Sequence, residues 1–148
     1  MSASPTSRTI NYLDAMGIRA GNVERYVHQV RKRYDLFGFL DVIACYPDCI
    51  AGLQITSTSN RSARVKKICG ERKQEALDFL ASNGHIEVWG WSKKGKAGKR
   101  KLWTPSVCQI TATPKGELIV AEIPAPDIFP RQKKRICKRL QKSKKAVA

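Results

Sequence analysis

The first part of the chain predicts one amphipathic helix. Apolar side chains recur at Ile10, Leu13 and Met16, so residues 7–16 would carry them on one helical face. Gly17 follows at the point where such a helix would end, because glycine readily adopts the left-handed conformation of a helix C-cap. This face is expected to pack against the core.

Three stretches after this helix have the composition of strands. Residues 23–30 contain three Val and one Tyr, and residues 39–46 (FLDVIACY) and 50–56 (IAGLQIT) are apolar on both faces. Pro47 and Asp48 separate the last two stretches, which is typical of a turn. We therefore expect residues 39–46 and 50–56 to form a hairpin in the centre of a sheet.

The second half of the chain mixes helical and strand patterns. Residues 57–60 (STSN) are helix-capping types, and Gly70 divides the helical pattern that follows from a second one at residues 72–82. Further strands are predicted at residues 85–91, 101–103, 107–111 and 117–123.

This order of elements predicts an α/β fold with a mixed central sheet flanked by helices. A chain of 148 residues fits a single domain, which we place at residues 1–123. Residues 124–148 begin with three prolines and continue with nine Lys or Arg residues, so we interpret them as a linker and a basic tail.

Net charge is the bulk property that says most about the partner of this chain. The chain holds 28 Lys and Arg residues against 12 Asp and Glu residues, a net charge of +16. Binding to a polyanion relieves the self-repulsion of such a chain and releases condensed counterions. An anionic membrane surface is the rival partner, but it calls for a basic amphipathic helix with large apolar anchors. Nucleic acid is therefore the favoured partner, with no membrane association.

The cysteines and the N-terminal sequence bear on the compartment. The five cysteines include no C-x-x-C pair, so we expect reduced, buried thiols and not a zinc site. No apolar run approaches the roughly 20 residues of a membrane span, and the first residues lack the apolar core of a secretory signal. We expect a cytoplasmic protein that is not secreted.

Polar residues interrupt the two central strands and suggest a metal site. Asp41 lies near the start of the first, and an ionised carboxylate there must be paired or bound to metal. Gln54 and Thr56 share one face of the second strand. A hairpin would bring these three residues to one end of the sheet, where oxygen ligands favour a divalent cation for phosphodiester chemistry. Capping a turn, or pairing with Arg31 or Arg33, is the structural alternative for Asp41.

At these residues the chain resembles the PD-(D/E)xK nuclease superfamily. The resemblance rests on residues 35–44 (DLFGFLDVIA), 53–57 (LQITS) and 60–67, and it covers roughly residues 9–91. More narrowly, it points to small phage and prophage relatives of the archaeal Holliday-junction resolvases. It implies a restriction-endonuclease-like core, Mg²⁺ or Mn²⁺ as cofactor, duplex or branched DNA as substrate, and a homodimer. It also implies a microbial cell or a phage-infected host.

The second motif of the superfamily is altered in this chain. Gln54 stands where the family has Glu, and Thr56 stands where it has Lys. The resemblance assigns Asp41 and Gln54 to the metal, and Asp41, Gln54, Thr56 and Lys67 to catalysis. Lys66 or Arg64 could supply the missing cation in place of Lys67. Possible supporting acids are Glu24 and Asp35, with Asp14 on the first helix as the acid that such sites often recruit.

Phosphate contacts are expected from basic residues in three segments: the loop after the first strand, the helix after Asn60 and a glycine-rich loop. The candidates are Arg31, Lys32, Arg33, Arg61, Arg64, Lys66, Lys67, Lys96, Lys99 and Arg100. The glycine-rich loop at 93–101 and the tail are expected to hold the duplex arms of the substrate.

Three functions stay open at this point. The first is a metal-dependent DNA endonuclease, structure-selective in the manner of a junction resolvase. The second is a DNA-binding module that kept the fold and lost the chemistry, which Gln54 and Thr56 favour. The third and weakest is an RNA-binding structural protein, based on charge alone.

Overall fold

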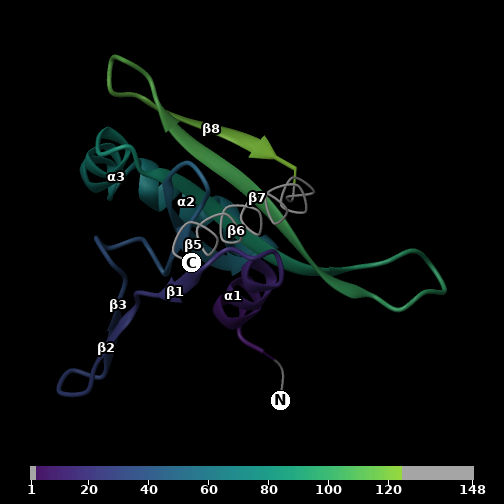
Figure 1. Cartoon of the computed structure of the whole chain (residues 1–148). Helices are drawn as coiled ribbons and strands as arrows, with labels where there is room; N and C mark the ends of the chain where they lie inside the picture. Colours follow the sequence, from purple (N-terminus) through teal and green to yellow (C-terminus); the bar gives the residue numbers. More distant parts are fainter. Residues whose placement is uncertain (1–2, 125–148) are drawn as a thin grey trace, which may run out of the picture.

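The computed structural model describes residues 3–124, and the predicted basic tail lies outside them (Figure 1). The helices are α1 (Pro5–Ala15), α2 (Arg61–Cys69) and α3 (Lys73–Ala81), with a short 3-10 helix, η1 (Thr58–Asn60), before α2. The strands are β1 (Ala20–Asn22), β2 (Arg25–Val27), β3 (Lys32–Tyr34), β4 (Val42–Cys45), β5 (Ile50–Ser57), β6 (His85–Lys94), β7 (Leu102–Ala112) and β8 (Leu118–Ile123).

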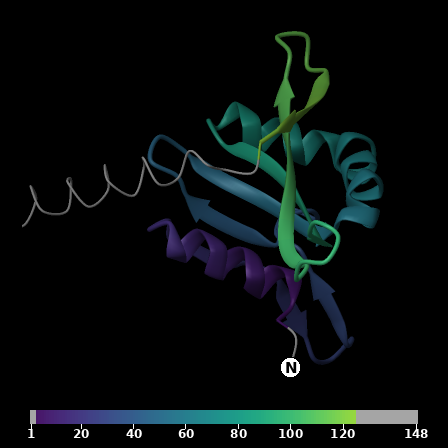
Figure 2. The ribbon, with the colours of Figure 1, turned by 90° about the vertical axis from the view of Figure 1, so that its right-hand side faces the viewer.

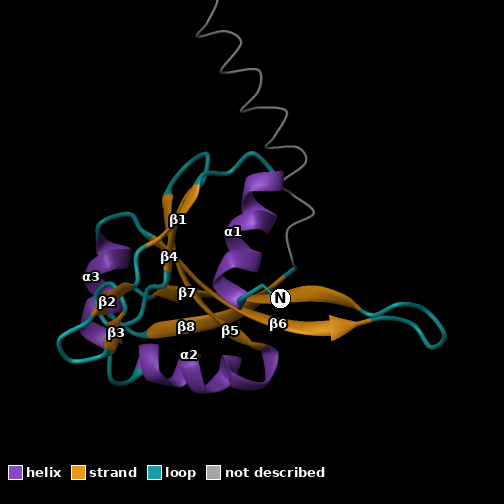
Figure 3. Ribbon diagram, turned by 90° about the horizontal axis from the view of Figure 1, so that it is seen from below, coloured by secondary structure: helices purple, strands orange, loops and turns teal. Residues whose placement is uncertain are grey.

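Six of the strands form one mixed sheet in the order β1-β4-β5-β6-β7-β8. β5 and β6 run parallel, and every other neighbouring pair runs antiparallel. The parallel pair requires a crossover, which η1, α2 and α3 provide. Figures 2 and 3 show α1 on one side of the sheet and α2 on the other. The predicted α/β fold and the hairpin of β4 with β5 are confirmed.

Strand alternation divides the core into two layers, one on each side of the sheet. Leu53 and Ile55 belong to the layer beneath α1, whereas Val88 of β6 belongs to the layer beneath α2 and α3. Gln54 and Thr56 alternate with these leucine and isoleucine side chains along β5, so they face α2. Polar groups therefore enter the α2 layer close to the end of β5.

The prediction of one strand over residues 23–30 is wrong. β2 covers only part of this stretch and pairs with β3 in a separate two-stranded sheet, which reverses through Arg31 at φ 50°. The side chains of both strands are largely exposed, so their β-branched and aromatic composition serves a hairpin in solvent and not the core. We call residues 25–34 the arm.

The predicted short strands 101–103 and 107–111 are parts of one strand, β7, which runs through Pro105. Among the described residues, β8 ends at the pair Val107–Ile123 and does not pair with β7 at Pro105, so a residue without an N–H is tolerated there. β6 and β7 stay paired as far as Lys94 and Leu102. We call residues 93–103 the ribbon, which projects well beyond the sheet (Figure 1).

Two smaller expectations also change. The strand predicted from residue 39 begins only at Val42, because Leu36 and Leu40 close a turn before it. Of the cysteines in residues 3–124, all free, Cys108 is buried but Cys45 is exposed. No helix in this part of the chain is long and apolar enough to cross a membrane.

Candidate metal centre and nucleic-acid interface

The β4–β5 hairpin brings Asp41 and Gln54 into contact, as the sequence predicts. Asp41 directly precedes β4, whose first residue Val42 pairs with Leu53, so Gln54 lies across from Asp41. The Nε2 of Gln54 donates to Oδ2 of Asp41 at 2.6 Å, and the backbone N–H of Ile55 donates to the same oxygen at 2.9 Å. Asp41 is 6% exposed and Gln54 1%. These contacts hold one carboxylate in a fixed, nearly dry position.

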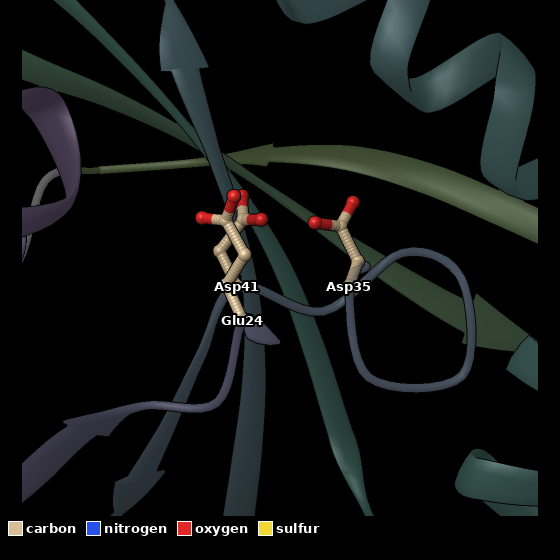
Figure 4. A group of neighbouring side chains, drawn as sticks. All are labelled: Glu24, Asp35 and Asp41. Carbon is tan, nitrogen blue, oxygen red and sulfur yellow. The ribbon is translucent and has the colours of Figure 1, made fainter. Parts of the chain in front are cut away.

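Two more carboxylates reach Asp41 from the ends of the arm (Figure 4). Glu24 directly precedes β2 and Asp35 directly follows β3, so the pairing of Arg25 with Tyr34 keeps the two acids close together. One carboxylate oxygen from each of Glu24, Asp35 and Asp41 lies within 4.8 Å of the other two. We call these three residues the acid cluster. Two of its three members therefore directly flank the arm.

The acid cluster carries negative charge with little compensation. Burial raises the pKa of Asp41 to about 7; the N–H of Ile55 acts against this rise, and the carboxylates of Asp35 and Glu24 add to it. Among residues 3–124, the ion pair of the acid cluster joins Arg33 to Glu24, with the Arg33 Nε 3.9 Å from the Glu24 Oε1. The Arg33 side chain is 74% exposed. An exposed pair of this kind contributes little. A bound cation would relieve the repulsion among the three carboxylates.

Gln54 adds an observation that fits such a cation. Its Oε1 is buried and has no hydrogen-bond partner among the described residues, while its Nε2 is committed to Asp41. An unsatisfied buried acceptor costs about 1–3 kcal/mol, so it is rarely kept without a role. Carboxylate and amide oxygens are the ligands that Mg²⁺ and Mn²⁺ prefer. Asp41, Glu24, Asp35 and Gln54 together therefore fit a divalent cation.

The predicted catalytic residues Thr56 and Lys67 differ in their surroundings. Thr56 is buried at 7% exposure and carries no charge. Lys67, on α2, lines a pocket of about 340 Å³ together with Asp35, Arg33 and Arg72. Arg64 and Lys66, the other cations considered on α2, do not line this pocket. Of the three, Lys67 is the best placed to meet an anion next to the acid cluster.

The predicted phosphate contacts differ in their exposure. Arg31, Lys32 and Arg33 on the arm are exposed, and so are Lys96, Lys99 and Arg100 at the tip of the ribbon. On α2, Lys66 is exposed, and Arg64 and Lys67 are half-buried. Figures 1 and 3 show the arm and the ribbon at opposite ends of the sheet.

Arg61 has a different partner from the one expected. Its NH1 donates to Oε2 of Glu122 at 2.9 Å, and its NH2 donates to Oε1 of the same residue. The Arg61 side chain is only 18% exposed. This two-pronged ion pair ties the start of α2 to β8, so we leave Arg61 out of the proposed interface.

Sequence reasoning missed a second polar group, on the α1 side of the sheet. Glu87, 4% exposed, accepts hydrogen bonds from Tyr46 Oη at 2.5 Å and Trp89 Nε1 at 3.0 Å, and its other oxygen lies 2.8 Å from Nε2 of His85. The signal was the single acid within the apolar stretch HIEVWGW. Asp14, by contrast, is exposed on α1 and does not join the acid cluster.

The comparisons with known proteins leave the site to be interpreted from its geometry. No family model, no curated protein and no solved structure matches this chain. The function must therefore be inferred from the acid cluster, the pocket beside it and the distribution of basic residues.

Proposed function

We propose that this protein is a divalent-metal-dependent DNA endonuclease that hydrolyses phosphodiester bonds. The observation that carries the proposal is the grouping of Glu24, Asp35 and Asp41, beside a Gln54 that contacts Asp41 and whose buried Oε1 has no partner among the described residues. Such oxygen ligands suit Mg²⁺ or Mn²⁺. The net charge of +16 favours a phosphate backbone as the partner. A metal-binding site and a polyanion partner together favour phosphodiester hydrolysis over simple binding.

The order of elements supports a restriction-endonuclease-like core. The PD-(D/E)xK resemblance assigns an Asp and a Glu to two neighbouring strands, with a helix after the second. Here Asp41 precedes β4, Gln54 lies in the antiparallel partner β5, and α2 and α3 lead to β6, which is parallel to β5. Glu24 and Asp35, which flank the arm, add two carboxylates to that of Asp41. They supply the negative charge that the altered second motif lacks.

The residues divide the chemistry between them. A divalent cation, when bound, supplies positive charge to the scissile phosphate and lowers the pKa of an attacking water. Asp41, Glu24, Asp35 and Gln54 would hold that cation. Lys67 and Arg72, which line the adjoining pocket, would stabilise the negative charge that develops on the phosphate. Lys67 would thereby supply the positive charge that the family's lysine provides and that Thr56, at the same position, lacks.

A second candidate function is a DNA-binding module without catalysis. Gln54 in place of a carboxylate and Thr56 in place of a lysine favour it, since both substitutions remove charge from the superfamily's second motif. Such a module keeps the basic arm and ribbon but has no use for three carboxylates that repel one another. We therefore prefer the nuclease.

A substrate panel tests the proposal. Labelled linear duplex, single-stranded and four-way-junction DNA would be incubated with the full chain in Mg²⁺, Mn²⁺ or EDTA. We expect strand cleavage that requires the metal, and the preferred substrate will show whether the enzyme is junction-selective. Junction selectivity and a homodimer rest on the resemblance alone. Tight binding of every substrate without any cleavage would favour the binding module.

Gln54→Glu tests whether Gln54 faces the metal. A fourth carboxylate beside Asp41 should tighten Mn²⁺ binding at least tenfold, because added ligand charge strengthens a hard-cation site. Calorimetric titration of Mn²⁺ into the metal-free protein at pH 8 measures this change. Gln74→Glu, at an exposed position of α3, is the matched control and should leave Mn²⁺ affinity unchanged. Equal affinity in both variants and the wild type would remove Gln54 from the ligand set.

A further inference from the structure

The ribbon is the most concentrated basic feature among the described residues. Residues 93–101 contain six Lys or Arg residues and no Asp or Glu. Their side chains are exposed throughout, and the two strands project beyond the sheet (Figure 1). Because the ribbon tip is exposed and residues 93–101 contain no acid, its positive charge is available to a partner.

The ribbon continues the sheet in the direction in which β5 runs past Gln54, the hydrogen-bond partner of Asp41. β5 and β6 run side by side, with Gln54 opposite Val88 and the last pair formed by Ser57 and Trp91. β6 continues past that point to Lys94 while β5 does not. At about 3.3 Å per residue, the ribbon strands end roughly 20 Å beyond the level of Gln54, and the tip extends a few ångströms farther.

A contact with α1 fixes the direction of the ribbon. Trp103, at the base of the ribbon, pairs with Lys93 across the two strands. The guanidinium of Arg8 lies 3.9 Å from the centre of the Trp103 ring, and Nζ of Lys93 lies 5.4 Å from it. Cations over an aromatic face are attracted to it. The ribbon is therefore a braced continuation of the central sheet, and its distance from the acid cluster is set by the fold.

We propose that the ribbon binds duplex DNA about six to eight base pairs from the scissile phosphate, a spacing of roughly 20–27 Å at 3.4 Å per base pair. The inference rests on the proposed function, because it takes the acid cluster as the point of cleavage. A two-stranded ribbon fits the major groove. A ribbon held at its base at a fixed distance matches a stiff duplex, whereas a flexible single strand has no fixed spacing. The substrate therefore needs a duplex arm of at least that length on one side of the cut.

The test compares three proteins on DNA ladders of increasing duplex length. The ribbon variant is Lys96→Ala/Lys99→Ala/Arg100→Ala, at the exposed tip. The matched control is Arg19→Ala/Lys73→Ala/Lys115→Ala, which removes the same charge from exposed positions elsewhere. Binding is measured with Ca²⁺ in place of Mg²⁺ over a series of salt concentrations, and hydroxyl-radical footprints are recorded on a 30-base-pair duplex.

The ribbon variant should lose protection at one place, six to eight base pairs from the cut. Its slope of log Kd against log salt should fall by about three, and its affinity at about 0.15 M salt should drop at least tenfold. The control should keep the wild-type footprint. An unchanged footprint in the ribbon variant, or wild-type affinity that does not depend on duplex length, would overturn the inference.

The two proposals fail in distinguishable ways. If the wild-type protein cuts no DNA, the nuclease proposal fails, but the loss of one flank of the footprint in the ribbon variant still shows that the ribbon binds duplex. If the protein cuts DNA and the ribbon variant keeps the full footprint, the nuclease stands and the ribbon inference falls. Stronger binding of structured RNA than of duplex DNA at equal salt overturns the ribbon inference as well.

Discussion

Asp41→Asn should abolish metal-dependent cleavage while leaving DNA binding in place. Asn has the shape of Asp and can still accept the N–H of Ile55, but it lacks the charge that a divalent cation requires. Loss of this ligand removes several kcal/mol of transition-state stabilisation, so we expect at least a thousandfold lower cleavage rate. Single-turnover cleavage with saturating enzyme measures the rate, and a gel-shift assay in Ca²⁺ measures binding.

The control for this variant lies on the same hairpin. Asp48 is exposed in the turn between β4 and β5, at the end of the hairpin opposite Asp41. Asp48→Asn makes the same chemical change there and should cleave at the wild-type rate. If Asp41→Asn also cleaved within threefold of the wild type, the acid cluster would not be the catalytic centre.

The second large effect concerns stability and pH. The pKa of Asp41 is raised from 3.8 to about 7, so the folded state holds a proton that the unfolded state releases. The stabilisation is complete below pH 4 and is lost as pH rises to about 7. Without metal, the free energy of unfolding should therefore fall between about pH 4 and pH 7, by at most about 4 kcal/mol over the whole transition. Added Mn²⁺ should restore stability at pH 8, because it binds the ionised cluster.

Urea unfolding in EDTA at several pH values checks this prediction. Asp41→Asn carries no titrating group at this position, so its stability should change little over the same range and exceed that of the wild type at pH 8. Asp48→Asn should retain the wild-type pH dependence. Parallel pH profiles for the wild type and Asp41→Asn would show that the burial of Asp41 is not what destabilises the metal-free protein.

The hairpin half of the site could be predicted from sequence, because it depends on local rules. Asp41 and Gln54 lie on two apolar strands separated by a short turn around Pro47, and strand alternation assigns their faces. Pattern and turn chemistry are enough to place the two residues side by side. The helix pair divided at Gly70 is a local signal of the same kind.

The arm could not be predicted, because the hydrophobic pattern does not indicate which residues of β2 and β3 pair. Residues 23–30 read as one strand, yet only part of them pairs, and the partner is the basic stretch that follows. The register of Arg25 with Tyr34 is what brings Glu24 and Asp35 together. These acids could be named as candidates, but their closeness to Asp41 depends on tertiary structure.

The hydrophobic pattern also could not predict contacts between segments that lie far apart in the sequence. Arg61 looked like one more cation on a basic helix, and its ion pair with Glu122 depends on where β8 lies against the start of α2. The ribbon was interpreted as a glycine-rich loop, and β7 as two short strands on either side of Pro105. β7 continues through Pro105, where the described part of β8 no longer pairs with it.

The binding of a divalent cation by Glu24, Asp35 and Asp41 is the claim on which the proposed catalysis depends. Anomalous X-ray scattering from crystals of the full chain soaked in Mn²⁺ tests it most directly. We expect one strong peak within about 2.2 Å of a carboxylate oxygen of Asp41, with Glu24 or Asp35 and the Oε1 of Gln54 completing the protein ligands. Absence of a peak at this position at millimolar Mn²⁺, with the acid cluster ordered and above pH 8, would contradict the claim.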